Sequence, residues 1–82
     1  MEKIIERMKN DNLTEKIATG EVNDIPILVR KYSTEDNWVL EIIVNEVNMP
    51  LTQTKEEYEK NIERIFQEQI EKYNLELKYN SK

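Results

Sequence analysis

The segment from residue 54 to residue 73, TKEEYEKNIERIFQEQIEKY, constrains the fold more than any other part of this chain. Its large apolar residues recur every three or four positions, so they share one side of a helix. They are Tyr58, Ile62, Ile65, Phe66, Ile70 and Tyr73. Thr54 and Glu57 have the spacing of a capping box, Thr52 is the alternative N-cap, and Asn74 marks the helix end. Burying the stripe yields roughly 1.5–3 kcal/mol per large side chain before entropy is subtracted. The segment therefore predicts a long helix that needs an apolar face to cover.

The same helix carries six glutamates, most of them outside the apolar stripe. Glu56 precedes Lys60 by four residues, and Glu68 precedes Lys72 by four. Such pairs contribute about 0.2–0.5 kcal/mol each and keep an exposed face soluble. A solvated face is the favoured interpretation of these acids, and an acidic recognition surface is the alternative.

The rest of the chain alternates in the manner of strands. Trp38, Leu40, Ile42 and Val44 predict the core face of the clearest strand, and residues 47–51 are expected to form a connector. Gly20 is expected to adopt a backbone conformation that other residues avoid. The predicted order is helix 2–11, strands 13–19, 25–32 and 38–46, helix 54–73 and strand 75–79. This order predicts one α+β domain over residues 1–82, with a mostly antiparallel sheet of about four strands packed against one long helix.

Composition limits the chemistry of the chain. Its 82 residues are enough for one thin core and contain no cysteine or histidine. Thiolate chemistry, imidazole catalysis and the commonest metal ligands are therefore excluded. Ser33 and Ser81 have no histidine partner. A metal site made of oxygens is still open to Asp and Glu, but the acids show no EF-hand spacing. We expect no enzyme, no cofactor and no metal.

Charge and hydropathy indicate the partners and the compartment. The formal net charge is −5, which argues against direct binding of nucleic acid or of an anionic membrane. It favours a protein partner with a basic surface. No apolar run approaches the roughly 20 residues that span a bilayer, and the N-terminus does not resemble a signal peptide. A cytoplasmic location is therefore expected.

Two groups of residues are candidates for partner binding. Acids and amides of the loops and of the outer sheet face could imitate a phosphate backbone, although turns use the same residue types for structure. They are Asp24, Glu35, Asp36, Asn37, Glu41, Glu46 and Asn48. Leu28, Val39 and Ile43 would form an exposed apolar patch if only one helix covered the sheet. The short N-terminal helix could instead cover them.

The first half of the chain also carries a family resemblance. The stretch EKIIERMKNDNLTEKIATGEVNDIPILVRKYSTEDNWVLEI places an amphipathic helix, an Asn/Asp break and three short strands in order. In this order and in its acidic composition the chain resembles the small anti-CRISPR proteins of phages that infect low-GC Gram-positive bacteria. The resemblance implies a phage or mobile-element inhibitor that occupies the DNA-binding surface of a CRISPR nuclease. The strand at 75–79 departs from that family, and no functional residue is transferred from it.

The sequence thus leads to two functional hypotheses. The first is an acidic inhibitor that blocks a basic, nucleic-acid-binding surface of a defence protein. The second is an assembly or regulatory module, either a homodimer built on the outer sheet face or a free edge strand, or an immunity- or antitoxin-type partner. Charge reversal at Glu35, Asp36 and Glu46 would disrupt the first, whereas polar residues at Val39 and Ile43 would disrupt the second.

Overall fold

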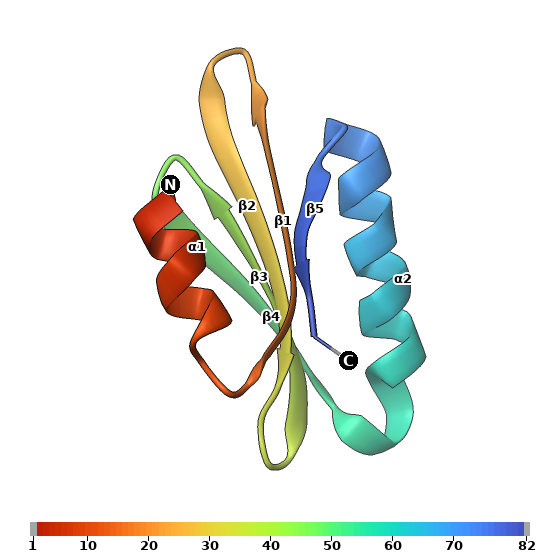
Figure 1. Cartoon of the computed structure of the whole chain (residues 1–82). Coiled ribbons are helices and arrows are strands. Elements are labelled where there is room, and N and C mark those ends of the chain that lie inside the picture. The colour runs from red at the N-terminus through yellow and green to blue at the C-terminus, as the bar shows by residue number, and fades with distance from the viewer. Residues whose placement is uncertain (1, 82) are drawn as a thin grey trace.

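A computed structural model describes the backbone of residues 2–81 and the side chains of residues 3–54 and 59–81 (Figure 1). The α+β class expected from the sequence is confirmed, with five strands instead of about four. The elements are α1 (Glu2–Lys9), β1 (Thr14–Val22), β2 (Ile25–Ser33), β3 (Asn37–Val44), β4 (Val47–Thr54), α2 (Lys55–Tyr73) and β5 (Glu76–Asn80).

The strands form one antiparallel sheet in the order β4-β3-β2-β1-β5. The first four strands follow one another as a meander. The chain then leaves β4 at one edge, returns through α2, and adds β5 at the opposite edge (Figure 1). Consequently α2 has to cross the sheet.

The expectation of a connector at residues 47–51 is wrong, because these residues begin β4. The turn between β3 and β4 has only two residues, Asn45 and Glu46, with φ values of 49° and 69°. Two left-handed residues in a row are typical of the tight hairpin turn that matches the strand twist. The register then runs without a break from Val44↔Val47 to Asn37↔Thr54.

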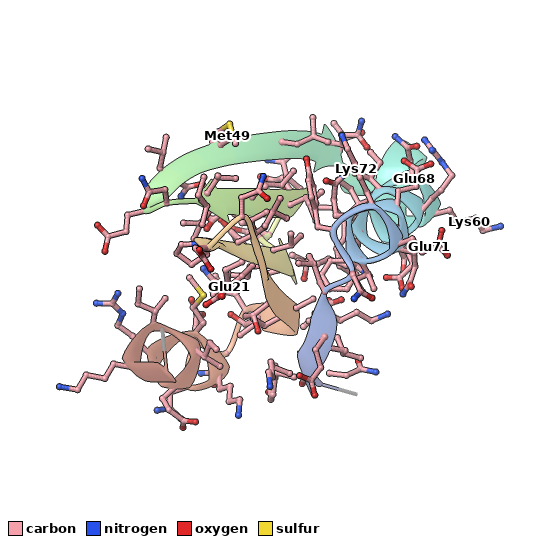
Figure 2. All side chains as sticks on the ribbon, turned by 90° about the horizontal axis from the view of Figure 1, so that it is seen from above. Glu21, Met49, Lys60, Glu68, Glu71 and Lys72 are labelled. Carbon is pink, nitrogen blue, oxygen red and sulfur yellow. The ribbon has the colours of Figure 1, made fainter. Side chains whose placement is uncertain are left out.

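The two faces of the sheet carry separate apolar clusters. On the α2 face, Phe66 and Ile62 are fully buried against residues of the central strands. These are Ala18, Ile27, Val29, Trp38, Leu40 and Leu75. On the opposite face, Ile5 of α1 packs with Ile17 and Leu28. In Figure 2 the two helices lie on different sides of the sheet.

The expectation for Gly20 is also wrong, since its φ is not positive and it lies within β1. The sequence has glycine here for space: an added Cβ would lie 2.7 Å from Cδ2 of Leu75. The predicted helix end is confirmed, because Asn74 adopts the left-handed conformation with φ 52°. Thr54 is the N-cap residue but makes no side-chain capping hydrogen bond, and the Glu57 side chain lies outside the described residues.

Candidate interaction surface at the corner of the sheet

The α2 helix leaves one corner of its own sheet face uncovered. Its first turns are held to β4 by Asn61, whose Nδ2 donates to Oε1 of Gln53 at 2.9 Å. From there α2 runs toward β5 and away from the other end of β4. The residues left exposed at that end form what we name the corner patch. They are Ile25 (43% exposed), Val47 (62%), Met49 (49%) and Leu51 (37%).

The corner patch is a continuation of the main core. Val47, Met49 and Leu51 face Val44, Ile42 and Leu40 across the β3–β4 register. These three neighbours belong to the core beneath α2, where Leu40 is fully buried. Ile25 shares the face of Ile27 by strand alternation. In Figure 2 Met49 lies on β4, at the border of the sheet.

The outer backbone edge of β4 faces no other strand of the described chain. In a two-residue hairpin the closing pair, Val44 and Val47, exchanges both hydrogen bonds, and bonded and non-bonded pairs then alternate. Position 50 therefore belongs to a non-bonded pair, and an N–H there would point outward. Pro50 has no N–H, so the free edge lacks a donor at its middle.

Three acids lie at the turn end of the sheet, and two of them, Glu21 and Glu46, belong to its α1 side and not to the face of the corner patch. Glu21, Asp24 and Glu46 are exposed, and no ion pair of the described side chains includes them. The two turns are joined because the Asn45 N–H donates to the Pro26 carbonyl at 3.1 Å. We name Glu21, Asp24 and Glu46 the acidic tip. Figure 2 looks onto this end and labels Glu21.

The structure does not bring the seven predicted acids and amides together. Asp24 and Glu46 lie in the turns at the top of Figure 1, whereas Glu35, Asp36 and Asn37 lie at the bottom. An eight-residue strand separates the two ends by about 23 Å. No single acidic surface joins them, so the phosphate-mimicking arrangement expected from the sequence is not formed as one site.

Glu41 and Asn48 lie on the α1 face and contact other residues of the chain. Glu41 accepts a hydrogen bond from the Tyr32 hydroxyl at 2.6 Å and one from Asn48 Nδ2 at 3.5 Å. Arg30 Nη1 lies 4.0 Å from its carboxylate. Burial, together with the bond to Glu41, raises the pKa of Tyr32 to about 12. The carboxylate of Glu41 therefore interacts with side chains of its own chain, namely Tyr32, Asn48 and Arg30.

The apolar patch expected at Leu28, Val39 and Ile43 depended on a single covering helix, and the alternative is the one observed, because α1 lies on that face. Leu28 is only 1% exposed because α1 and its neighbours cover it. Val39 is 6% exposed, and Ile43 is half-buried beside the α1 cluster. Two helices cover the sheet, one on each face, and the exposed apolar residues of the corner patch lie on β4 and at the start of β2 instead.

A cluster that the sequence did not reveal fastens α2 to the sheet. Lys16 and Lys31 each donate to a different oxygen of the Glu63 carboxylate. Burial alone would raise the pKa of Glu63, but the hydrogen bonds and charges of both lysines hold this pKa at about 2. Lys31 also lies 4.8 Å from the centre of the Trp38 ring. Its core-facing position after Ile27 and Val29 was the signal available in the sequence.

A hollow of about 370 Å³ lies between α1 and the sheet. Its lining combines apolar side chains with Arg7, Glu46 and Asn48. Within residues 3–54 and 59–81, no group of three or more acids is arranged to hold a metal ion. None of the described helices is long and apolar enough to cross a membrane.

In comparisons with known proteins, no protein family, curated protein or solved structure matches this chain. Fold and surface define a small acidic α+β protein with an uncovered apolar corner at one sheet edge.

Proposed function

We propose that this chain is a protein-binding module that docks a partner on the corner patch. One observation carries the proposal: four large apolar side chains are 37–62% exposed on a face that is otherwise core. An 82-residue chain has little apolar surface to spare, and an exposed patch of this kind usually marks an interface. Covering it would contribute roughly 25 cal/mol per Å² of buried apolar area.

The charges support a basic partner. The acidic tip lies beside Ile25 and Val47, and the whole chain carries a net charge of −5. Complementary charges around an apolar contact accelerate association and make it sensitive to salt. A basic, nucleic-acid-binding protein, as the anti-CRISPR resemblance implies, is one such partner. Inhibition of that partner stays a prediction.

The chain offers a matched control for the test. Met49 on β4 and Leu77 on β5 are exposed to a similar degree, 49% and 44%, on opposite edges of the sheet. Tagged wild type, Met49→Asp and Leu77→Asp would be used to capture proteins from a lysate of a low-GC Gram-positive bacterium, with elution by a salt gradient. We expect a basic protein that binds wild type and Leu77→Asp but is lost with Met49→Asp.

Charge reversal gives a second comparison. Asp24→Lys with Glu46→Lys changes the acidic tip, whereas Glu35→Lys with Asp36→Lys changes the opposite end by the same charge. The first pair should weaken capture at moderate salt, and the second should not. Capture that is equal for all variants would contradict the proposed function.

A further inference from the structure

We infer that the element that fills the corner patch is an amphipathic α-helix with basic flanks, contributed by the partner protein. The inference rests on the proposed function and specifies what docks there. Three independent features of the sheet support it: the width of its α2 face, the chemistry of its free edge and the charge beside the patch.

The α2 face is too wide for one helix. Five strands spaced about 4.8 Å apart span about 19 Å between the outer strand axes, whereas a helix with side chains is about 10–12 Å across. The boundary of the covered area is visible between neighbouring strands. Leu40 of β3 is fully buried, but Leu51, its partner on β4, is 37% exposed. About 7–9 Å of the face is thus left beside α2, which is close to the interaxial distance of about 8–10 Å between two packed helices.

The length of the corner patch also suits a helix. From Val47 to Leu51 the strand advances four residues, or about 13 Å. Apolar side chains at positions i, i+3, i+4 and i+7 of a helix span about 10 Å along its axis. Two to three turns of an amphipathic helix would thus contact the whole length of the patch, as in other helix-in-groove complexes.

The free edge of β4 is poorly suited to the other common occupant, an added strand. Strand addition depends on a row of outward N–H and C=O groups. Pro50 removes the donor in the middle of the outward row, between Asn48 and Thr52. Side-chain contact with the patch, by contrast, needs no backbone donor from β4. The same reasoning disfavours a second copy of this chain joined edge to edge.

The charge beside the patch selects the flanks of the helix. The acidic tip has no ion pair among the described side chains, and Asp24 and Glu46 directly precede Ile25 and Val47 of the patch in the chain. Lysine or arginine at the end of a docked helix would be attracted over a longer range by the negative charge at this end of the sheet, without contacting Glu21 or Glu46, which lie on the α1 side. An acidic helix of the same apolar pattern would be repelled.

Two synthetic peptides of about 14 residues and identical leucine and lysine content separate the alternatives. One has leucines at helical spacing, and the other has strictly alternating leucines. Binding of each labelled peptide would be measured by fluorescence anisotropy against wild type, Met49→Asp and Leu77→Asp. Circular dichroism would verify that both variants fold, and Val47→Asp would replace Met49→Asp if it did not.

We expect the helical peptide to bind wild type and Leu77→Asp at least tenfold more tightly than Met49→Asp. Tighter binding of the alternating peptide, abolished by Met49→Asp, would overturn the helix and leave the proposed function standing. A wild-type dimer that Met49→Asp dissociates in sedimentation would overturn it in favour of a second copy. If both peptides bound wild type and Met49→Asp with the same affinity, or if neither peptide bound, the inference would also be overturned.

Discussion

Gly20 of β1 lies against Leu75, and a Cβ atom added at Gly20 would be 2.7 Å from Leu75 Cδ2 and 3.4 Å from its Cα. Leu75 is itself buried in the main core. Alanine in a strand usually gains about 0.5–1 kcal/mol over glycine. Here the overpacking cost of about 1–3 kcal/mol should exceed that gain. We expect Gly20→Ala to lower the free energy of unfolding by about 1–2 kcal/mol in urea denaturation.

A double-mutant cycle would locate the cause of that loss. Leu75→Ala alone should destabilise by roughly 2–5 kcal/mol because it leaves a cavity. In the Leu75→Ala background, however, Gly20→Ala should cost nothing, because the contact it crowds is gone. The same loss in both backgrounds would show that the Leu75 contact is not responsible.

The sequence predicted those parts of the fold that depend on side-chain periodicity. The stripe of Phe66 and the alternation around Leu40 gave the helix and the central strand, and both are core in the structure. Strand β4 was missed because Pro50 interrupts it and because Glu46, unlike glycine, gives no hint of a left-handed turn residue. Exposed apolar residues were therefore expected around Val39, whereas the structure exposes Met49, since the position of a free edge depends on strand count and strand order.

The cluster around Glu63 predicts a dependence of stability on pH. The folded pKa of Glu63, about 2, lies below its ordinary value of 4.5. A lowered carboxylate pKa stabilises the fold above pH 4.5, and this contribution is lost as the pH falls toward 2. Because the side chain is one third exposed, we expect Glu63→Gln to cost about 1–2 kcal/mol at neutral pH and to flatten the acid limb.

Glu68 on the same helix provides the control for Glu63. It pairs with Arg64 at 2.5 Å, but both side chains are more than half exposed. Glu68→Gln removes the same charge and should change stability by no more than about 0.5 kcal/mol. Urea denaturation between pH 2 and pH 7 would compare the two variants. Equal pH profiles for both would exclude a special role of the Lys16–Glu63–Lys31 cluster.

The turn between β3 and β4 predicts a stabilising substitution. Glu46 has φ 69°, a conformation that costs a non-glycine residue roughly 1–2 kcal/mol. Glu46→Gly would create the Asn-Gly pair that such turns prefer. After the greater flexibility of unfolded glycine is subtracted, we expect a gain of about 0.5–1 kcal/mol, seen as a higher melting temperature. Glu35 lies in the loop between β2 and β3, and its φ is not positive. Glu35→Gly should therefore not raise the melting temperature.

The absence of an N–H at Pro50 is expected to keep other strands from pairing with the free edge of β4. Pro50→Thr restores an outward N–H next to three exposed apolar side chains, which together make an edge prone to strand addition. We expect the variant to form dimers or larger species in sedimentation at concentrations where wild type does not. It should also bind the alternating leucine–lysine peptide more tightly.

Pro26→Thr is the control, because β2 has a strand on each side. A different result would be a Pro50→Thr variant that sediments like wild type and gains no affinity for that peptide. The missing N–H of Pro50 would then not be what prevents strand addition, and an added strand would again be a possible occupant of the corner patch.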